Sequence, residues 1–212
     1  MTKADTSQDK KTQILSAATI LLARQGLQAF SYEALAHEAG LSRQLIRYYY
    51  DDPDDLIADL CDHLGNAYRQ TLVAGVVDIG QVERLGFFMD FFFDLAEGYP
   101  MPDKLEVYDA MMAYAGGSEQ VKGRMRGQYQ TLGQVMVHEL AIAHPALTGE
   151  ACEELSFLFV SMMHAHWSFV ASLGYSRDHG RLARKAMDRL IASYVAETQF
   201  TPCMDKPWAL DG

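Results

Sequence analysis

The chain has 212 residues, about half of them hydrophobic, and a formal net charge of −10 at pH 7. This length and composition suffice for one large domain, or for a small domain joined to a larger one, and they exclude wholesale disorder. No apolar stretch approaches the roughly 20 residues of a membrane span.

The cysteines and the N-terminus indicate a cytoplasmic protein. Cys61, Cys152 and Cys203 are odd in number and far apart, as is typical of free thiols in a reducing compartment, and they lack the spacing of zinc ligands. The first 13 residues, MTKADTSQDKKTQ, are polar and contain no apolar core of a signal peptide. We expect no membrane segment, no metal and no cofactor.

The first part of the chain is predicted to contain three helices. The first has apolar residues at helical spacing and closes at Gly26. Ser31 is placed to cap a short second helix, which ends at Gly40. Ser42 is placed to cap a third helix that runs to about Tyr49.

The rest of the chain is also predicted to be helical. A long helix begins near Pro53, and no alternating strand pattern bounded by hairpin turns occurs. We therefore expect an all-α fold with about nine helices. The tail, residues 201–212, contains two prolines and is expected to be irregular. The further helices are predicted over residues 80–97, 102–115, 118–143, 149–173 and 178–199.

The front part of the chain has features of a DNA-binding domain. Residues 1–50 hold six basic and four acidic side chains, whereas the remainder carries a net charge of −12. A helix ended by glycine, a short turn and a serine-capped helix form the outline of a helix-turn-helix. In the major groove, arginine can read guanine and glutamine can read adenine. The second of these helices would present Arg43, Gln44, Leu45, Arg47 and Tyr48 to such a groove.

The segment SYEALAHEAGLSRQLIRYYYDDPDDL resembles the DNA-binding signature of the TetR family of transcriptional regulators, over about residues 12–60. The family resemblance implies an N-terminal three-helix DNA-binding domain, followed by a helical effector-binding and dimerisation domain. The matching residues are Phe30, Ser31, Leu35, Ala36, Ala39, Gly40, Leu41, Ser42, Ile46, Tyr49, Tyr50 and Leu56.

The resemblance also implies a different role for each of three consecutive tyrosines. Tyr49 lies where a phosphate-contacting tyrosine is usual, Tyr48 where a residue contacts a base or the backbone, and Tyr50 where an aromatic residue belongs to the core. Successive helical residues differ by about 100° in direction, so the three side chains cannot share one face. The predicted DNA-binding residues are Ser31, Ser42, Arg43, Gln44, Leu45, Arg47, Tyr48 and Tyr49.

One position departs from the family pattern. The family usually has a lysine just before the fourth helix, whereas this chain has Pro53 within DDPDD. Asp52 can cap a helix that starts at Pro53, and the acids that follow suit its dipole; tuning of DNA release is the alternative role. We expect modest DNA affinity with a shallow salt dependence, or reliance on Arg43, Arg47, Lys10 and Lys11.

The acidic body is rich in aromatic residues and methionines between residues 80 and 173. Such side chains form adaptable walls for ligands, but they also form ordinary cores, and the pattern leaves both open. No histidine pair has metal-ligand spacing, and one histidine in this region is a candidate polar contact for a ligand. We predict a pocket for a small apolar or aromatic effector, lined by Phe88, Phe91, Phe92, Tyr108, Met112, Tyr129, Met163, His166 and Trp167.

The last two predicted helices are candidates for a dimer interface. The helix over residues 149–173 is apolar on nearly every side after Glu154, so it must be covered on all sides. Two such helices would form a four-helix interface with a second copy, and the resemblance implies the same pairing. The stripe on the last helix consists of Ala183, Met187, Leu190 and Tyr194.

We therefore predict a homodimeric, ligand-responsive repressor that binds a double-stranded DNA operator and has no catalytic residues. One alternative is an enzyme acting on an aromatic or hydrophobic small molecule through Asp90 and Asp94. Another is a protein-binding regulator that has lost DNA binding through its acidic turn. The expected domains are residues 1–52 (helix-turn-helix DNA binding), 53–200 (effector binding and dimerisation) and 201–212 (tail).

Overall fold

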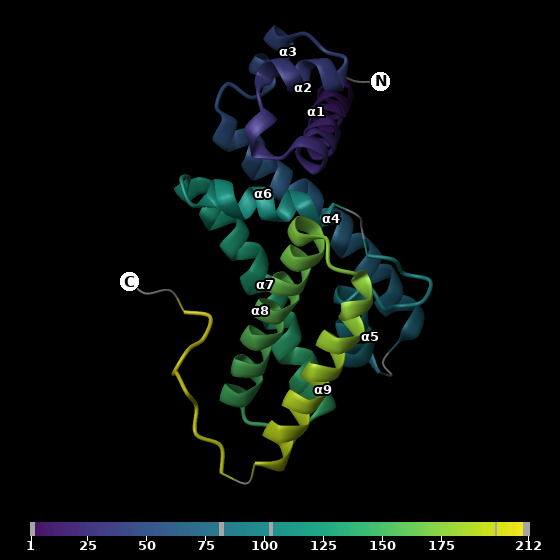
Figure 1. Ribbon diagram of the computed structural model, residues 1–212, viewed down its shortest axis with the longest axis vertical. Coiled ribbons are helices and arrows are strands. Elements are labelled where there is room, and N and C mark those ends of the chain that lie inside the picture. Colours follow the sequence, from purple (N-terminus) through teal and green to yellow (C-terminus); the bar gives the residue numbers. More distant parts are fainter. Residues whose placement is uncertain (1–2, 81–82, 102–103, 198, 210–212) are drawn as a thin grey trace. The chain divides into compact units, whose positions relative to one another are not determined.

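The computed structural model describes residues 3–80, 83–101, 104–197 and 199–209. Within these residues the chain forms nine α-helices, two short 3₁₀ helices and no strand, which confirms the predicted all-α class (Figure 1). The elements are α1 (Lys3–Gln25), η1 (Leu27–Ala29), α2 (Tyr32–Ala39), α3 (Arg43–Tyr49), α4 (Pro53–Ile79), α5 (Arg84–Phe92), α6 (Leu105–Ala115), α7 (Glu119–Ala143), α8 (Gly149–Leu173), η2 (Arg177–His179) and α9 (Gly180–Ala196).

The chain packs as two compact units. The first unit comprises residues 1–67 and 103–126, and the second comprises residues 68–102 and 127–212. The long helices α4 and α7 each contribute one part to each unit. These packing units do not coincide with the predicted functional domains, so those domain limits stay a prediction.

Short polar residues set the ends of the helices in the first unit, as predicted. The Ser31 hydroxyl accepts a hydrogen bond from the Ala34 N–H (3.1 Å) at the start of α2. The Ser42 hydroxyl accepts one from the Leu45 N–H (3.1 Å) at the start of α3. Gly40 ends α2 with φ of 63°, a left-handed conformation that glycine adopts without strain.

The first unit buries the apolar faces of its helices in a common core. Helix α1 packs against both α2 and α6. The Sγ of Cys61 on α4 lies 3.2 Å from the Sδ of Met111 on α6, so these two helices also touch. This core fixes the position of α3 because one side of α3 belongs to it. Its buried members include Ile14, Leu21, Leu35, Ile46, Tyr50 and Leu56.

Helix α5 is shorter than the predicted helix over residues 80–97. It ends at Phe92 because Asp94 has φ of 58°, which is incompatible with a helix. The Asp94 carboxylate stabilises this turn by accepting hydrogen bonds from the Met101 N–H (3.4 Å) and from the guanidinium of Arg177 (3.0 Å). The hydrophobic periodicity continues past Phe92, so the prediction from periodicity alone placed the end of this helix too late.

Two other predicted helices also have different limits. The one predicted over residues 102–115 begins only after Lys104, whose φ of 127° excludes a helical conformation. The one predicted over residues 178–199 starts with a 3₁₀ turn and ends before Glu197, which is extended. Parts of the three predictions lie outside the described residues, namely residues 81–82, 102–103 and 198.

Part of the apolar stripe of α9 packs against the same chain. Helices α8 and α9 run side by side (Figure 1). Met187 is fully buried, and the Tyr194 hydroxyl donates a hydrogen bond to the buried Glu154 carboxylate of α8 (3.0 Å). Met187 and Tyr194 therefore have partners within the same chain, and a dimer interface through the last two helices stays a prediction.

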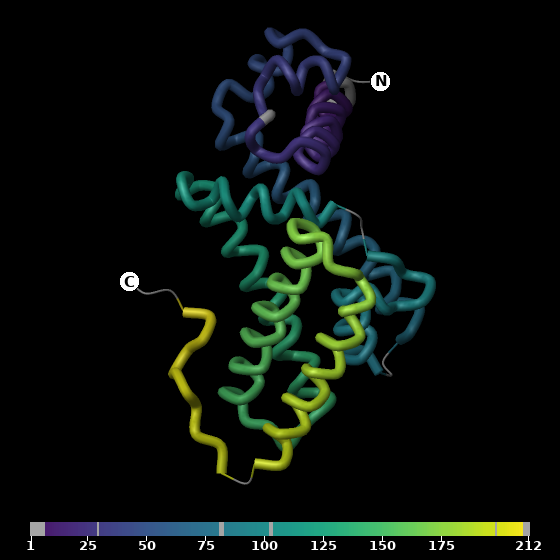
Figure 2. The backbone as a smooth tube through the Cα atoms, in the orientation of Figure 1, coloured from purple at the N-terminus to yellow at the C-terminus, as the bar shows by residue number. Residues whose placement is uncertain are grey.

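Residues 199–209, the C-terminal strap, have no regular secondary structure but are packed in place. Figure 2 shows the strap turning back beside α8. The indole N–H of Trp208 donates to the Ser156 hydroxyl (3.2 Å), and Gln130 donates to the Trp208 carbonyl (3.1 Å). A Cβ atom at Gly133 would overlap the Trp208 ring, so the glycine makes room for the strap.

Candidate nucleic-acid interface and effector region

Helix α3 is anchored by the core on one side and carries polar side chains on the other. Ile46 is fully buried, and Leu45 is half-buried at the edge. Apart from the half-buried Tyr49, the remaining positions face solvent, because the helix is only seven residues long and packs on one side. The predicted DNA-binding residues that are exposed are Ser31, Ser42, Arg43, Gln44, Arg47 and Tyr48.

The three consecutive tyrosines lie in three different environments, as predicted from their spacing. Tyr48 is 80% exposed, Tyr49 is half-buried against it, and Tyr50 is only 2% exposed. The Tyr50 hydroxyl donates to the Asp59 carboxylate (3.0 Å), and burial together with this carboxylate raises the pKa of Tyr50. Tyr50 therefore holds α3 against α4, while Tyr48 is free to contact a ligand.

One basic residue expected to support DNA binding is already engaged. Lys11 lies 3.3 Å from the Asp59 carboxylate, and its ammonium group is 5.0 Å from the centroid of the Tyr50 ring. Lys10 donates a hydrogen bond to Gln13 (2.9 Å) on the same helix. Lys11 would have to leave Asp59 and Tyr50 in order to contact DNA. Its part in DNA binding stays a prediction.

Arg47 is held in position by an aromatic neighbour. Its guanidinium carbon lies 5.5 Å from the centroid of the Tyr32 ring, within the range of a cation–π contact. The Tyr32 hydroxyl in turn donates to the backbone carbonyl of Asp51 (3.3 Å). An arginine held this way loses less conformational freedom when it binds a base or a phosphate.

The acidic turn starts α4, as predicted. Pro53 is the first residue of the helix, and the Asp54 N–H donates to the Asp52 carboxylate (2.9 Å). This arrangement is a helix N-cap followed by proline at the first helical position.

Two of the turn's aspartates also have partners that the sequence did not reveal. The Asp54 carboxylate accepts hydrogen bonds from the Tyr114 hydroxyl (2.7 Å) and the Ser118 hydroxyl (2.6 Å). Asp55 accepts one from Gln120 (2.8 Å). The hydrogen bonds from Ser118 and Tyr114 lower the pKa of Asp54. The start of α4 is thus tied to α6 and to the first turn of α7, all within the first unit.

Four of the predicted effector residues form a closed aromatic cluster in the second unit. The Trp167 indole N–H donates to the Phe92 carbonyl (3.0 Å), and the two rings lie 6.0 Å apart. Tyr68, which sequence reasoning missed, joins the cluster 5.6 Å from the Trp167 ring. All four predicted members, Phe88, Phe91, Phe92 and Trp167, are buried, so the cluster packs as core in this conformation. Met163 is buried as well.

The structure does not bring the other predicted effector residues into this cluster. Tyr108 and Met112 belong to the first unit, where Tyr108 is buried and Met112 is 43% exposed. Tyr129 lies beside α8, where its hydroxyl is 2.7 Å from Nδ1 of His164. His166 is half-buried 6.0 Å from the Phe93 ring, and burial lowers the pKa of His166.

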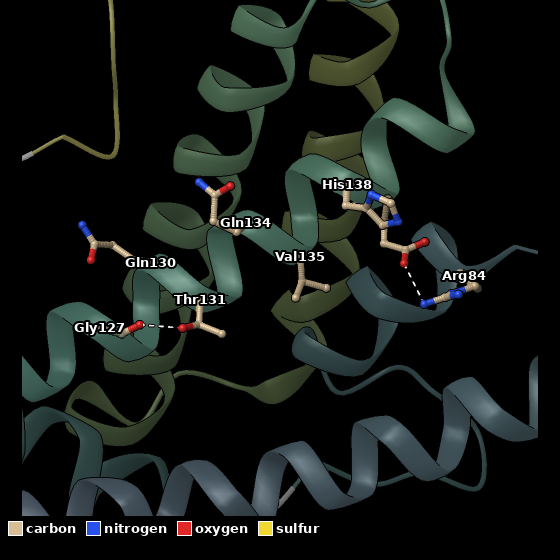
Figure 3. Close-up of a pocket in the computed structure, with 8 residues that line it drawn as sticks. Arg84, Gly127, Gln130, Thr131, Gln134, Val135 and His138 are labelled. Atoms are coloured by element: carbon tan, nitrogen blue, oxygen red, sulfur yellow. Dashed lines mark hydrogen bonds and ion pairs between the residues drawn. The ribbon is translucent and has the colours of Figure 1, made fainter.

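Two surface depressions lie on the second unit, and none of the predicted effector residues lines either. One, of about 580 Å³, follows an exposed side of α7 (Figure 3), where Arg84 of α5 pairs with Glu139 (2.9 Å). Figure 3 shows the other labelled lining residues along α7, with Arg84 contributed by α5. The other, of about 1,110 Å³, is a groove between α5 and α9.

The two acids considered for an enzyme are both in ion pairs. Asp90 accepts a hydrogen bond from Nε of Arg184 (2.6 Å), and Asp94 pairs with Arg177 (3.0 Å). The two carboxylates therefore have different arginine partners, contributed by α9 and by η2.

Comparison with protein families matches residues 14–60 to the family described as "Bacterial regulatory proteins, tetR family". This match covers α1 from Ile14 onward, α2, α3 and the start of α4. These elements hold α3 in place and expose its polar side, the reading face. A comparison with curated proteins finds no match.

Solved structures share the fold over most of the chain. A TetR transcription regulator from Haloarcula marismortui is 19% identical with a TM-score of 0.72, covering 88% of this chain and 98% of its own. A transcriptional regulator from Saccharomonospora viridis, solved with choline, is 18% identical with a TM-score of 0.71, covering 87% and 96%. The multidrug binding protein EbrR, solved with imidazole, is 17% identical with a TM-score of 0.61, covering 85% and 94%.

The capped helix pair and the exposed helix α3 form a helix-turn-helix, within a fold that the chain shares with solved transcriptional regulators. Residues 14–60 carry the match to the TetR family, and the chain shares the fold of solved TetR regulators. Among the described residues, no helix is long and apolar enough to cross a membrane.

Proposed function

We propose that this protein is a homodimeric repressor, released from its DNA operator by a small apolar or aromatic effector. The observation that carries the proposal is the reading helix α3, which is anchored by Ile46 and Tyr50 and presents exposed polar side chains to solvent. A regulator of this kind acts in the cytoplasm.

The exposed residues of α3 have the chemistry needed to read DNA. Arg43 and Arg47 can each donate two hydrogen bonds to a guanine, and Gln44 can pair with an adenine. Tyr48 extends this surface, and Tyr49 at its edge is assigned to a phosphate. Ser31 and Ser42 lie at the N-termini of α2 and α3, where backbone N–H groups favour phosphates. Leu45 is assigned an apolar contact with a base methyl group.

An exposed apolar face on α8 and α9 supports the dimer. Phe169 is 54% exposed, and both Leu158 and Leu173 on the same helix are also exposed. Ser161 and Ala165 lie between them, so the helix backbones of two copies can approach closely. A second copy would cover this face, which is too apolar to suit a monomer in water.

The effector is assigned to the aromatic cluster of the second unit. In the present conformation the cluster is closed, so a ligand must displace some of its ring contacts to enter. Two structures with this fold were solved with choline and with imidazole, which supports a small-molecule site in this protein. The effector shifts the DNA-binding equilibrium only by the difference in its affinity for the two conformations.

The Asp54 hydrogen bonds suggest how the reading helix is held in one position. They tie the start of α4 to α6 and α7, and Tyr50 ties α3 to Asp59 on the same helix. A change in the position of α6 would therefore be transmitted to α4 and then to α3, all inside the first unit.

The proposal is tested by fluorescence anisotropy of the purified chain on labelled DNA from upstream of its own coding sequence, across a salt series. We expect saturable binding that weakens with salt, and a loss of about 5- to 150-fold for Arg47→Ala, the range of one two-bond base contact. Arg47→Lys keeps the charge, so its DNA affinity should lie between those of the parent chain and of Arg47→Ala. Arg24→Ala is the matched control, because Arg24 pairs with Glu38 away from α3 (3.4 Å).

Equal binding of the upstream DNA and of unrelated DNA at low salt would contradict the proposal. So would an Arg47→Ala variant that binds as tightly as Arg24→Ala.

A further inference from the structure

The groove between α5 and α9 is large enough for a small-molecule ligand. Its volume is about 1,110 Å³, at the upper end of the range of ligand sites. All of its lining residues belong to the second unit and come from the end of α4, from α5 and the turn after it, from the end of α7 and from α9 (Figure 1).

The floor of the groove is apolar and well fixed. Phe87 lies directly on Gly75 of α4, where a Cβ atom would overlap its ring, and it also packs against Tyr99 with ring centroids 5.5 Å apart. A ring held on two sides offers a firm surface for a ligand. The other apolar lining residues are Ile79, Leu85, Met89, Leu95, Ile191 and Val195.

The groove is lined by more acidic than basic side chains. Its arginine, Arg184, is already paired with Asp90 (2.6 Å) and with Asp188. Glu83 and Glu97 also line the groove, are exposed, and have no ion-pair partner among the residues that the structure describes. An anionic ligand would therefore be repelled, and a cation would supply the missing partner for these carboxylates.

We propose that this groove binds an organic cation with an apolar body, such as an alkyl or aryl ammonium compound. The apolar part lies on the floor around Phe87, and the positive group lies toward Glu83 and Glu97. The site is separate from the aromatic cluster assigned to the effector, and its existence does not depend on DNA binding.

The groove remains open in the proposed dimer. Four of the six α9 residues that line it are spaced four, three and four apart, so they share one side of the helix, with Ala192 and Ala196 at its edge: Arg184, Asp188, Ile191 and Val195. Leu182 and Ser193 lie on the opposite side, since each is about half a turn away from this stripe. A second copy seated against that opposite side leaves the groove accessible.

The test uses two probes of equal apolar length and opposite charge, decyltrimethylammonium and decyl sulfate, each below its micellar concentration. Isothermal titration calorimetry of the full chain should show saturable binding of the cation, and at least tenfold weaker binding of the anion. The double variant Glu83→Gln/Glu97→Gln should bind the cation at least fivefold more weakly. Asp205→Asn, on the exposed part of the strap, is the matched charge control and should bind as the parent chain does.

Gly86 on α5 offers a steric test of the location. A Cβ atom there meets no described atom closer than Nη2 of Arg184, at 4.0 Å, so a side chain can enter the groove without a backbone clash. Gly86→Phe should fill the groove and abolish binding of decyltrimethylammonium. Gly86→Ala should leave binding intact, and it favours the helix. Thermal melting of each variant verifies that it is folded.

Tight binding of decyl sulfate would overturn the proposal, because the selectivity for a cation would be absent. Undiminished cation binding by folded Gly86→Phe would also overturn it, because the ligand would then lie elsewhere. If the chain failed to bind operator DNA but passed both ligand tests, the proposed repressor function would fail while this site would stand.

Discussion

The reading face of α3 and the aromatic cluster of the second unit place similar side chains in opposite settings. On α3, Tyr48 is exposed beside arginines, whereas Phe91 and Trp167 in the cluster are closed off from solvent. The difference lies in what covers each helix: α3 is covered on one side only, whereas the rings of α5 are met by those of α8. An aromatic residue therefore indicates function only when its surroundings are known.

The largest expected effect follows from removing one ring of the cluster. Phe91→Ala should lower the free energy of unfolding by about 3–5 kcal/mol, because the buried ring leaves a cavity. Met112→Ala, at an exposed position, should change it by no more than about 0.5 kcal/mol. Urea unfolding followed by circular dichroism measures both. A cost below about 1 kcal/mol for Phe91→Ala would mean that the cluster is a preformed pocket rather than core.

The tyrosines of α3 separate binding from stability within one helix. Tyr50→Phe removes the hydrogen bond to Asp59 and should cost about 1 kcal/mol of stability. Tyr48→Ala should leave the melting temperature unchanged but weaken DNA binding by about tenfold, which corresponds to about 1.4 kcal/mol. Anisotropy and thermal melting on the same preparations provide both readouts. The reverse pattern would exchange the roles assigned to the two residues.

The Asp54 hydrogen bonds predict a pH-dependent contribution to stability. A carboxyl group whose pKa is lowered on folding stabilises the fold above its ordinary pKa of 3.8, and this contribution is lost as the pH falls through the lowered value. The melting temperature of Asp54→Ala should therefore lie below that of the parent chain at pH 7, and the two should converge in acid. Asp55→Ala, which loses one bond to Gln120, should show a smaller gap. A gap that persists unchanged to pH 2 would assign the effect to packing instead.

The smallest expected effect concerns the thiols. Cys203 on the strap is exposed, whereas Cys61 and Cys152 are buried, and burial raises the pKa of Cys61 to about 12. A thiol reagent at pH 8 should therefore label one cysteine in the folded chain and three in denaturant. Cys203→Ser should abolish the fast reaction. Rapid labelling of Cys61 would show that α4 and α6 separate readily.

Sequence reasoning succeeded where short-range chemistry decides the structure. The caps at Ser31 and Ser42 and the turn at Gly40 each involve residues within four positions, so their effect is visible in the sequence. The directions of Tyr48 to Tyr50 follow from the same local geometry. These features define the helix-turn-helix and its exposed face.

The rest of the site depends on partners that are distant in sequence. The Asp54 carboxylate meets hydroxyl groups 60 and 64 residues away, and no local pattern signals that pairing. A pocket wall and a packed core have the same composition, so the periodicity around Phe91 could not separate them. The groove between α5 and α9 was missed because its lining residues come from four separate helices.

The strap also constrains the order in which this chain can change during evolution. While Trp208 occupies its place on α7, any side chain at Gly133 collides with the indole ring. A lineage can enlarge position 133 and keep the strap in place only after position 208 has become smaller, because in the reverse order the indole ring is displaced. Two positions 75 residues apart should therefore vary together among descendants, with the tryptophan lost before the glycine.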